Sequence, residues 1–424
     1  MELCKPFNIK NGELFIDNYK ILDMVNKYNT PLILYSADII RNNYNTLYKT
    51  FKGYYKNFSI KYAIKANSNL AILSFLNKIN SGVDVSSIGE IYSAEKAGIN
   101  YDKMLFSPNN IGINEFKYAI KNNIAINFDD INQFKMLNKF PDKISFRINP
   151  GIGKGEFKEI TTGGRKSKFG INVDTAINAY ELAKSKGIKH FGIHMMAGSN
   201  SLDNEYFISI ADKFFDIAGM ISKKAEITFD FIDIGGGFGI PYRENDKPLN
   251  INYISKNIIK NLKSKLNDYD LGNPELNIEP GRYIVGNSAI ALGRINNIKR
   301  YYDNFVGTDL NMNIFLRIPL YKAHHNIEII NKFNVEKNFK ANVVGNVCEN
   351  TDKIGSNAYI PEPEINDIIA IYNAGAYVSS MENNYNGRLK PLEILYDNNN
   401  FYVIRKRDNL KDLTINMKIP DYLK

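Results

Sequence analysis

The sequence predicts an α/β fold in two parts, a (β/α)₈ barrel followed by a C-terminal β domain. Between residues 59 and 279, eight apolar, β-prone runs alternate with helix-length segments, and eight parallel strands are the number that closes such a barrel. From about residue 283 the helical periodicity weakens and short strand-like runs predominate. We therefore expect a barrel over residues 33–282 and a β domain over residues 283–424, joined by the N-terminal segment 1–32.

The predicted elements follow one another in a regular order. Ahead of the barrel we expect a strand at 13–17, a helix at 19–28, an apolar run at 31–36 and an amphipathic helix at 37–51. The barrel strands are expected at 59–66, 83–87, 104–108, 125–129, 144–149, 190–197, 229–235 and 276–279. Most are separated by helices, expected at 70–79, 88–97, 113–121, 131–140, 175–186, 202–223 and 253–266. In the β domain, runs such as 367–372 and 400–404 are the clearest strands.

Composition points to an ordinary globular protein. The chain of 424 residues is long enough for two or three domains, and it has 44% hydrophobic and 23% charged residues. A net charge of +9 would suit a nucleic-acid-binding protein, but the lysines are scattered along helix-like stretches such as 256–265. Such scatter is typical of a solvated helix face, so we expect no nucleic-acid partner.

The cysteine content and the apolar runs of the sequence indicate the cellular compartment. Cys4 and Cys348 are the only cysteines, which is too few for a disulfide framework and favours a reducing compartment. The first residues lack the pattern of a signal peptide, and no apolar run approaches the roughly 18 residues of a membrane span. We expect a cytoplasmic protein with no membrane partner.

The stretch SIKYAIKAN, residues 59–67, places a lysine at the end of a predicted buried strand. Burial of an amine disfavours its charged form and lowers its pKa. A neutral amine is the form that attacks an aldehyde, so Lys65 is a candidate covalent anchor for pyridoxal phosphate. An isolated lysine at a strand end more commonly extends to solvent, so this interpretation depends on the rest of the chain.

Unusual polar residues and glycines gather at the carboxyl ends of the predicted strands. In a (β/α)₈ barrel these ends form a single face, the one on which active sites are built. We therefore expect a shared site that includes Lys65, Asp84, Arg147, residues 194–199, Gly235, Gly236, Gly237 and residues 279–282.

Two of these segments suit particular parts of such a cofactor. The run IGGGFG provides three consecutive glycines, whose backbone N–H groups can approach a phosphate without interference from a Cβ atom. Its place after the seventh strand, beside an arginine after the eighth, matches the usual phosphate position in such barrels. Glu279 could hold a proton on a pyridine nitrogen, so that the ring accepts electrons. Alone, each signal is weak, because glycine runs are commonly turns and glutamates commonly form ion pairs.

Motifs along nearly the whole chain resemble those of the fold-type III PLP-dependent decarboxylases, which have an alanine-racemase-like barrel. They are, in order, YAIKAN, GVDVSSIGEI, RINPG with SKFGI, GSN, IDIGGGFGIPY, IEPGR, CENTD and GAYVSSMENNYNGR. The resemblance extends from about residue 31 to about residue 395. The family includes ornithine, arginine and diaminopimelate decarboxylases. The stretches RINPG, GGGFGIPY, RIPLYKAHH and NNYNGR look most like diaminopimelate decarboxylase.

The resemblance implies roles for individual residues. Lys65 would bind the cofactor covalently and Glu279 would face its ring nitrogen. Asp84 and Arg147 match polar residues beneath the cofactor. The phosphate region is matched by Ser199, Gly235, Gly236, Gly237, Arg282 and Tyr377.

The resemblance also implies a substrate site in a homodimer. Cys348 of CENTD matches a residue that reaches in from the partner subunit and returns a proton to the substrate carbon, and Glu349 matches the group that takes a distal amine. The distal carboxylate would be held by Arg317 and Tyr321 of RIPLY with Arg282, and Tyr377 would also border the substrate. On its own each of these residues could be structural, Cys348 as a small apolar residue for example.

One position departs from the family pattern. Most members have a histidine two residues before the Gly-Ser that follows the sixth strand, stacked on the cofactor ring, whereas HMMAGS has Met196 there. A methionine can pack on a ring through its sulfur, but we expect no hydrogen bond and no charge from it. No metal site is expected, because no metal-ligand spacing links His194, His324 and His325, which we assign structural roles.

Together these features favour a PLP-dependent amino-acid decarboxylase, with meso-diaminopimelate as the substrate and L-lysine as the product. Met196 leaves open a related amino acid or a carrier-bound aminoacyl substrate, because family members with less usual substrates also tend to lack the histidine. A non-catalytic PLP-binding homeostasis protein would lack the β domain with its CENTD and GAY segments. A racemase would need a tyrosine base where this chain has Cys348.

Overall fold

The computed structural model describes residues 4–151, 153–156, 163–164, 167–196 and 198–424. The chain forms two compact units, one over Ile40–Gly286 and the other over Met1–Ile39 together with Asn287–Lys424. The N-terminal segment that joins the β-rich unit therefore ends at Ile39, seven residues beyond the expected boundary at residue 32. The reason is strand β4 (Leu32–Ser36), which pairs with β15 (Ala289–Arg300) and β21 (Leu392–Asp397) in the sheet of the second unit.

The first unit is a closed barrel of eight parallel strands in the order β11-β13-β14-β5-β6-β7-β8-β9. Each lies where the sequence predicted a strand, so the (β/α)₈ prediction is confirmed. The bounds are β5 Phe58–Ala63, β6 Gly82–Val85, β7 Met104–Phe106, β8 Ala125–Phe128, β9 Lys143–Ile148, β11 His190–Met195, β13 Phe231–Asp233 and β14 Glu275–Ile278. Short strands β10 (Lys154–Gly155) and β12 (Gly198–Ser199) pair outside the barrel.

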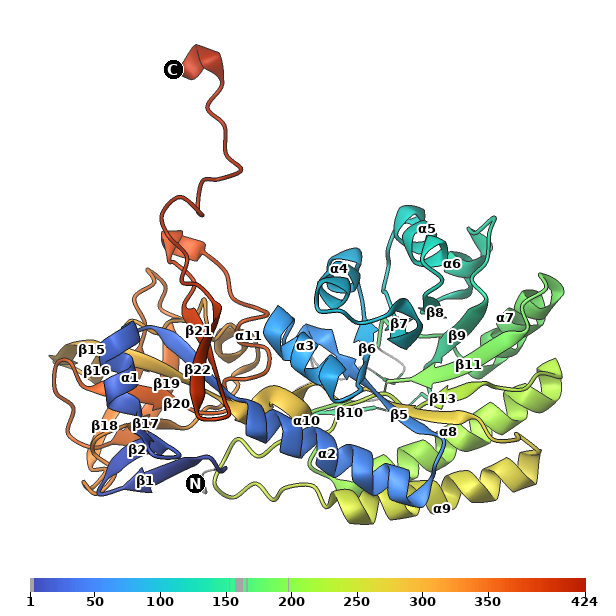
Figure 1. The fold of residues 1–424 in the computed structure, drawn as a ribbon, viewed down its shortest axis with the longest axis horizontal. Coiled ribbons are helices and arrows are strands. Elements are labelled where there is room, and N and C mark those ends of the chain that lie inside the picture. Colours follow the sequence, from blue (N-terminus) through green and yellow to red (C-terminus); the bar gives the residue numbers. More distant parts are fainter. Residues whose placement is uncertain (1–3, 152, 157–162, 165–166, 197) are drawn as a thin grey trace. The chain divides into compact units, whose positions relative to one another are not determined.

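Helices follow the barrel strands and surround them (Figure 1). Several begin at a polar residue whose side chain accepts a backbone N–H of the first turn, as Asn69, Ser87, Asp203 and Asn250 do. Such caps explain why these helices start where they do. The bounds are α2 Ala37–Tyr54, α3 Leu70–Lys78, α4 Ile88–Lys96, α5 Ile113–Lys121, α6 Ile131–Lys135, α7 Val173–Ser185, α8 Asn204–Ala225, α9 Ile251–Tyr269 and α10 Arg282–Val285.

Aromatic rings fill part of the layer between strands and helices of the barrel. Phe128 and Phe146 on neighbouring strands lie 5.7 Å apart, and Phe134 of α6 packs on both at 5.5 and 5.8 Å between ring centroids. Phe116 of α5 stacks on Phe128 at 5.4 Å. Buried aromatic contacts of this kind anchor the helices to the strands, which holds the ends of the strands in fixed positions.

The second unit is rich in β-structure, as the sequence predicted. Its main sheet has the strand order β19-β18-β16-β15-β4-β21-β22, with β17 and β20 attached, and a separate sheet is formed by β1-β2-β3. The bounds are β1 Phe7–Lys10, β2 Glu13–Ile16, β3 Tyr19–Lys20, α1 Ile21–Tyr28, β16 Asn304–Thr308, α11 Arg317–Tyr321, β17 Ile327–Ile329, β18 Phe339–Val344, β19 Lys353–Ile360, β20 Ile368–Ile371 and β22 Asn400–Arg405. One buried apolar cluster joins N-terminal residues such as Leu14 to Ile290 and Ile394.

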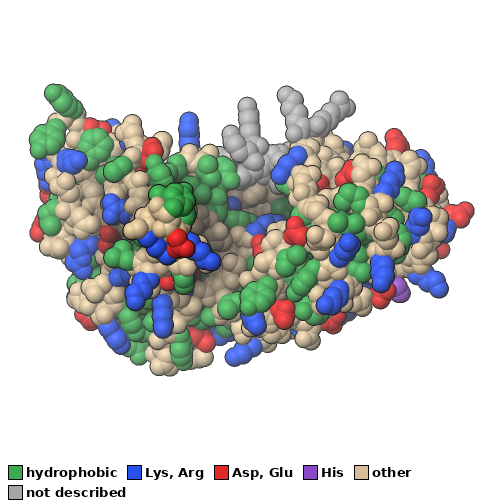
Figure 2. All heavy atoms as spheres, turned by 90° about the horizontal axis from the view of Figure 1, so that it is seen from above, with side chains coloured by type: hydrophobic (Ala, Val, Ile, Leu, Met, Phe, Trp, Pro, Cys, Tyr) green, Lys and Arg blue, Asp and Glu red, His purple; other side chains and the backbone are tan. Residues whose placement is uncertain are grey.

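Two surface properties bear on function. In the parts of the chain that the structure describes, no helix has both the length and the apolar character needed to span a bilayer. Lysine and arginine side chains are dispersed among other types on the face seen in Figure 2.

Candidate active site

Strand register brings three polar side chains of the barrel into one layer. His194 of β11 pairs directly with Arg147 of β9 on one side and with Asp233 of β13 on the other. Residues that pair directly on neighbouring strands point to the same side of a sheet. Lys65 and Glu279 lie just beyond the ends of β5 and β14, so the polar residues of five strands gather at the carboxyl end of the barrel.

Lys65 lies in a single 3-10 turn, Ile64–Ala66, that directly follows β5. Its Nζ atom is 3.1 Å from Oδ2 of Asp84, and 44% of its side chain is exposed. The burial expected from the sequence is therefore wrong for this lysine, because the backbone leaves the barrel wall before residue 65. Lys61, within β5, is half-buried, and desolvation lowers its pKa.

Asp84 is 2% exposed, and its carboxylate accepts a hydrogen bond from the ammonium group of Lys65. Burial, followed by the charge of Glu279, raises the pKa of Asp84 to about 6, while Lys65 opposes the rise. The pair thus combines an accessible amine with a carboxylate that gives up its proton only near neutral pH.

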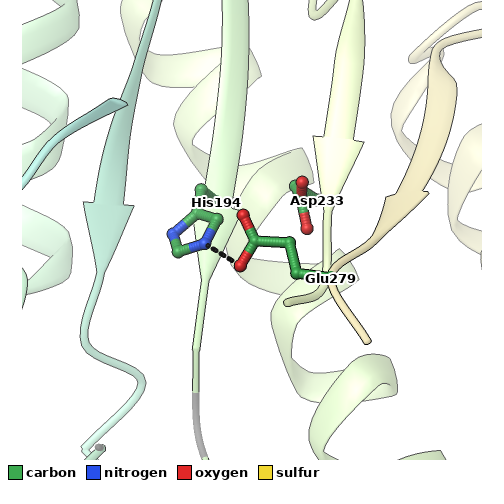
Figure 3. A group of neighbouring side chains, drawn as sticks. All are labelled: His194, Asp233 and Glu279. Carbon is green, nitrogen blue, oxygen red and sulfur yellow. Dashed lines mark hydrogen bonds and ion pairs between the residues drawn. The ribbon is translucent and has the colours of Figure 1, made fainter. Parts of the chain in front are cut away.

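Glu279 is paired with a histidine to which the sequence analysis assigned a structural role. The Nε2 atom of His194 lies 3.2 Å from Oε2 of Glu279, and the two side chains are 1% and 3% exposed (Figure 3). Burial alone would raise the pKa of Glu279, but His194 and then Lys65 and Arg147 outweigh it and lower that pKa. Glu279 is therefore a buried carboxylate that stays ionised, and His194 belongs to the site.

Asp233 is a site residue that the sequence analysis missed. It is fully buried, and its Oδ1 atom accepts the N–H of Gly235 at 2.8 Å. It lies beside His194 and Glu279 (Figure 3), with ligand atoms of all three within 4.8 Å of one another. Burial and then the Glu279 charge raise the pKa of Asp233 well above its ordinary value. Its position directly ahead of the glycine run, in IDIGGG, was the available signal.

The glycine run approaches its neighbours so closely that side chains would not fit. A Cβ atom on Gly236 would lie 2.1 Å from the backbone oxygen of Glu279, and Gly235 and Gly237 have φ values of +69° and +93°. The N–H of Gly236 donates to Sδ of Met196 at 3.2 Å. The expectation that Met196 forms no hydrogen bond is therefore wrong, since its thioether is a weak acceptor.

Arg282 begins α10 beside the end of β5 and is 6% exposed. Its Nη1 atom donates to the hydroxyl of Tyr242 at 2.7 Å, another contact that the sequence did not indicate. A Cβ atom on the preceding Gly281 would lie 2.8 Å from Cβ of Ala66, so the glycine allows the two segments to approach. Ser199 lies in β12 and pairs with Gly155 of β10.

Five buried polar atoms in this group have no hydrogen-bond partner among the residues that the structure describes. They are Oδ1 of Asp84, Nη2 of Arg147, Nδ1 of His194, Oδ2 of Asp233 and Oε1 of Glu279. Buried polar groups are almost always hydrogen-bonded, so unpaired atoms gathered at one rim indicate a site built for a polar ligand.

Residues 39–286 match the family described as "Pyridoxal-dependent decarboxylase, pyridoxal binding domain". The chain belongs to this family. The matched range includes every barrel residue of the site, among them Lys65, Glu279 and the glycine run.

Relatives extend this similarity over the whole length of the chain. The chain is 39% identical to the diaminopimelate decarboxylase of Methanothermobacter thermautotrophicus, over 96% of each sequence. Its structure resembles that of the Methanocaldococcus jannaschii diaminopimelate decarboxylase in complex with L-lysine, with a TM-score of 0.86, 31% identity and 99% of each chain covered. It also resembles the Helicobacter pylori enzyme in complex with L-lysine, with a TM-score of 0.85, 35% identity and coverage of 93% and 98%.

The rim residues fit the pyridoxal phosphate that this family uses. The unpaired Oε1 atom of Glu279 is a buried anionic acceptor of the kind that a protonated ring nitrogen requires. The backbone of Gly235, Gly236 and Gly237, which carries no Cβ atoms, would suit a phosphate together with Arg282, and Lys65 offers an accessible amine. The three ligand atoms of His194, Asp233 and Glu279 could also meet around a small cation, but the cofactor accounts for the wider set.

The remaining predicted residues lie in the second unit. Arg317 begins α11 and is 2% exposed, and Tyr321 ends the same helix. The Nη1 atom of Arg317 lies 3.3 Å from Nε2 of His325, whose Nδ1 is 2.8 Å from the carbonyl oxygen of Tyr372. Because a carbonyl only accepts, Nδ1 carries a proton and donates, which leaves Nε2 to accept from the arginine. His325 thereby orients Arg317.

Cys348 and Glu349 lie side by side on an exposed turn of the second unit. Glu349 accepts a hydrogen bond from the hydroxyl of Tyr385 at 2.8 Å. Tyr377 has a φ of +57°, a left-handed conformation that is uncommon for a residue with a bulky side chain and is often found at functional sites. The barrel unit thus contains the predicted cofactor residues other than Tyr377, and the second unit contains the predicted substrate residues other than Arg282.

Proposed function

We propose that this protein decarboxylates meso-diaminopimelate to L-lysine with pyridoxal phosphate as cofactor. The observation that carries the choice of substrate is the buried Arg317, oriented by His325 and one turn of α11 from Tyr321. A guanidinium binds a carboxylate through two charge-assisted hydrogen bonds. A substrate such as ornithine or lysine ends in a cation and would be repelled there. Relatives with diaminopimelate decarboxylase as their name support the same choice.

The barrel residues hold the cofactor and control its protonation. Lys65 would attach it covalently, and in the cofactor-free protein the Lys65 ammonium donates to Asp84 at 3.1 Å. Glu279, kept ionised by His194, holds a proton on the ring nitrogen. When bound, pyridoxal phosphate supplies the electron sink that takes up the electron pair left behind by departing carbon dioxide. The residues that would hold the phosphate are Ser199, Gly235, Gly236, Gly237, Arg282 and Tyr377, and Arg147 would border the ring.

The second unit supplies the proton and recognises the far end of the substrate. Cys348 gives its thiol proton to the carbon that has lost the carboxylate. Arg317, Tyr321 and Arg282 bind the distal carboxylate, and Glu349 accepts the distal amine. Both polar groups on the distal carbon are thereby paired, which selects a substrate with an amino-acid group at each end.

We also infer a cytoplasmic homodimer in which Cys348 and Glu349 act on the barrel site of the partner subunit. Both residues are exposed in the single chain. The C-terminal residues Leu410, Ile415 and Met417 are 73%, 73% and 72% exposed, and such an apolar set favours cover by another subunit. Neither cysteine forms a disulfide within the described residues, which suits a reducing compartment.

The test is substrate preference together with an arginine variant. At equal concentrations, meso-diaminopimelate should release carbon dioxide faster than lysine, ornithine, arginine or glutamate. R317A should lower kcat/KM for diaminopimelate by roughly 2–5 kcal/mol, because a buried carboxylate loses its partner. R243A, at an exposed arginine, is the matched control. Preference for one of the other four amino acids, or an undiminished R317A variant, would contradict the proposed substrate.

A further inference from the structure

The turn that carries Cys348 and Glu349 is held by one other loop of the same unit, residues 383–388. The Oδ1 atom of Asn386 accepts the backbone N–H of Cys348 at 2.7 Å. The hydroxyl of Tyr385 donates to Oε1 of Glu349 at 2.8 Å, and the guanidinium of Arg388 donates to the carbonyl of Asn346. Three contacts therefore join residues 385–388 to residues 346–349.

The conformation of the holding loop suits an asparagine at position 386. Asn386 has φ 57° and ψ 21°, a left-handed conformation that asparagine adopts more readily than most residues. The following Gly387 is also left-handed, with φ +65°. This bend occurs beside the Cys348 turn, where the Asn386 amide oxygen meets the Cys348 N–H.

The holding loop is itself anchored by hydrogen bonds to the buried Asn313 and the half-buried Asp408. The side-chain amide of Asn313, which is 2% exposed, donates to the carbonyl of Tyr385 at 2.7 Å. The side chain of Asn384 donates to Oδ2 of Asp408 at 3.1 Å and to the carbonyl of Arg388 at 2.8 Å. Because the base is fixed, Tyr385 and Asn386 present their side chains in defined positions.

The turn that carries Cys348 and Glu349 is also held at its base. The carboxylate of Asp352, 3% exposed, accepts the backbone N–H groups of Val347 at 2.8 Å and Met312 at 2.6 Å. Val347 is buried, whereas Cys348 and Glu349 are exposed. Within the described residues, side-chain hydrogen bonds reach Cys348 and Glu349 from Asn386 and Tyr385.

We propose that Asn386 and Tyr385 are positioning residues, Asn386 for the thiol of Cys348 and Tyr385 for the carboxylate of Glu349. This inference rests on the proposed function, in which Cys348 donates the proton and Glu349 binds the distal amine. Asn386 fixes the peptide from which the thiol extends. Tyr385 occupies Oε1 of Glu349 and so leaves Oε2 for the substrate ammonium.

The phenol is suited to this task over the working pH range. Its hydrogen bond to Glu349, followed by the charge of that carboxylate, raises the pKa of Tyr385 above its ordinary value. Tyr385 therefore remains a neutral donor at neutral pH. A displaced proton donor slows the chemical step, whereas a misoriented amine acceptor weakens substrate binding. The two residues should accordingly affect different kinetic constants.

The experiment compares N386A, N386D and Y385F in the full-length, cofactor-loaded enzyme. N357A and Y359F are the controls. Asn357 is an exposed, left-handed asparagine with φ 52°, and Tyr359 is 59% exposed. Neither side chain hydrogen-bonds to any residue in the described ranges. Both controls should keep wild-type kinetics.

We expect N386A to lower kcat about tenfold and to leave KM within about twofold of wild type. We expect Y385F to raise KM about tenfold with little change in kcat. Each change corresponds to the loss of one hydrogen bond. N386D keeps the acceptor oxygen and should restore kcat. Its added charge beside the Cys348 peptide should move the alkylation of Cys348 by iodoacetamide to higher pH, because a nearby anion disfavours the thiolate. C4S removes the other exposed thiol from this assay.

The outcomes separate this inference from the proposed function. If N386A and Y385F match their controls while C348A is inactive, the positioning roles are wrong and the proton donor stands. A fully active C348A variant would overturn the role of the thiol itself. If N386A does not fold, the absence of an alkylation shift in N386D would still contradict the inference.

Discussion

The imidazole of His194 and the carboxylate of Glu279 lie 3.2 Å apart with almost no exposure to solvent. Without this neighbour, a buried carboxylate would tend to take up a proton. The contact therefore keeps Glu279 anionic, which is the state needed to hold a proton on a cofactor ring nitrogen. It also makes the unfolding free energy of the cofactor-free protein depend on pH.

We predict that E279Q binds pyridoxal phosphate but loses about 100-fold in kcat, because an amide cannot hold a proton on the ring nitrogen. A lowered pKa stabilises the fold above the ordinary value of the carboxyl group, and this stability disappears as the pH falls through the folded-state value. The advantage of wild-type apo-protein over E279Q in unfolding free energy should thus shrink below about pH 4. Denaturant unfolding between pH 3 and 8 measures it, and a constant difference would contradict the ionised state.

The stability contributed by Asp233 should depend on pH in the opposite direction to that contributed by Glu279. Its raised pKa stabilises the fold below the ordinary value of an aspartate, and this stability is lost as the pH rises toward the folded-state value. The groups that face it are Glu279, Asp84, Lys61 and His194.

D233N keeps an acceptor for the Gly235 N–H and stays neutral. The stability of wild-type apo-protein should therefore fall relative to D233N by about 1.4 kcal/mol per pH unit above about pH 4. Calorimetric unfolding above about pH 4 should release more protons from wild type than from D233N. D270N, at an exposed aspartate, is the control, and equal proton release from wild type and D233N would show that Asp233 is ionised in the fold.

The glycine run leads to a steric prediction. G236A would place a Cβ atom 2.1 Å from the backbone oxygen of Glu279, and only a shift of one backbone could relieve this overlap. We expect a loss of about 1–3 kcal/mol in stability and weaker binding of pyridoxal phosphate. G53A lies in α2 with open space around the new Cβ atom and should be neutral or slightly stabilising. Wild-type cofactor affinity in G236A would argue against a cradle at this turn.

Lys65 should be the site of covalent attachment. Loaded wild-type protein should absorb visible light and retain a pyridoxyl group on Lys65 after borohydride reduction, whereas K65A should show neither. K56A, at an exposed lysine of the same segment, should behave as wild type. Peptide mass spectrometry locates the label, and its recovery on another lysine would disprove the assignment.

Complementation tests the shared site. K65A and C348A should each be nearly inactive alone, since each lesion affects both sites of a symmetric dimer. In a heterodimer one site has neither lesion, so an equal mixture after subunit exchange should recover about a quarter of wild-type activity. Sedimentation checks the dimer, and an active monomer would exclude the arrangement.

Much of the barrel could be predicted from the sequence. The alternation of apolar strands and helix-length segments is a local property, and it located all eight strands because each strand buries side chains along its own length. The direction of parallel strands then placed Lys65, Asp84, Arg147 and Glu279 at one end without any knowledge of their contacts.

The tertiary structure alone decided which of these groups meet. His194 and Glu279 are 85 positions apart in the chain, and the neighbours of His194 in the barrel depend on strand register, which no local pattern specifies. The same holds for Asp233 beside Glu279 and for the sulfur of Met196 on Gly236. Lys65 is exposed, contrary to the expectation from the sequence, because the backbone leaves the barrel after Ala63. A sequence determines which faces of its elements are apolar, but the charge state of a buried group depends on neighbours that only packing brings within a few ångströms.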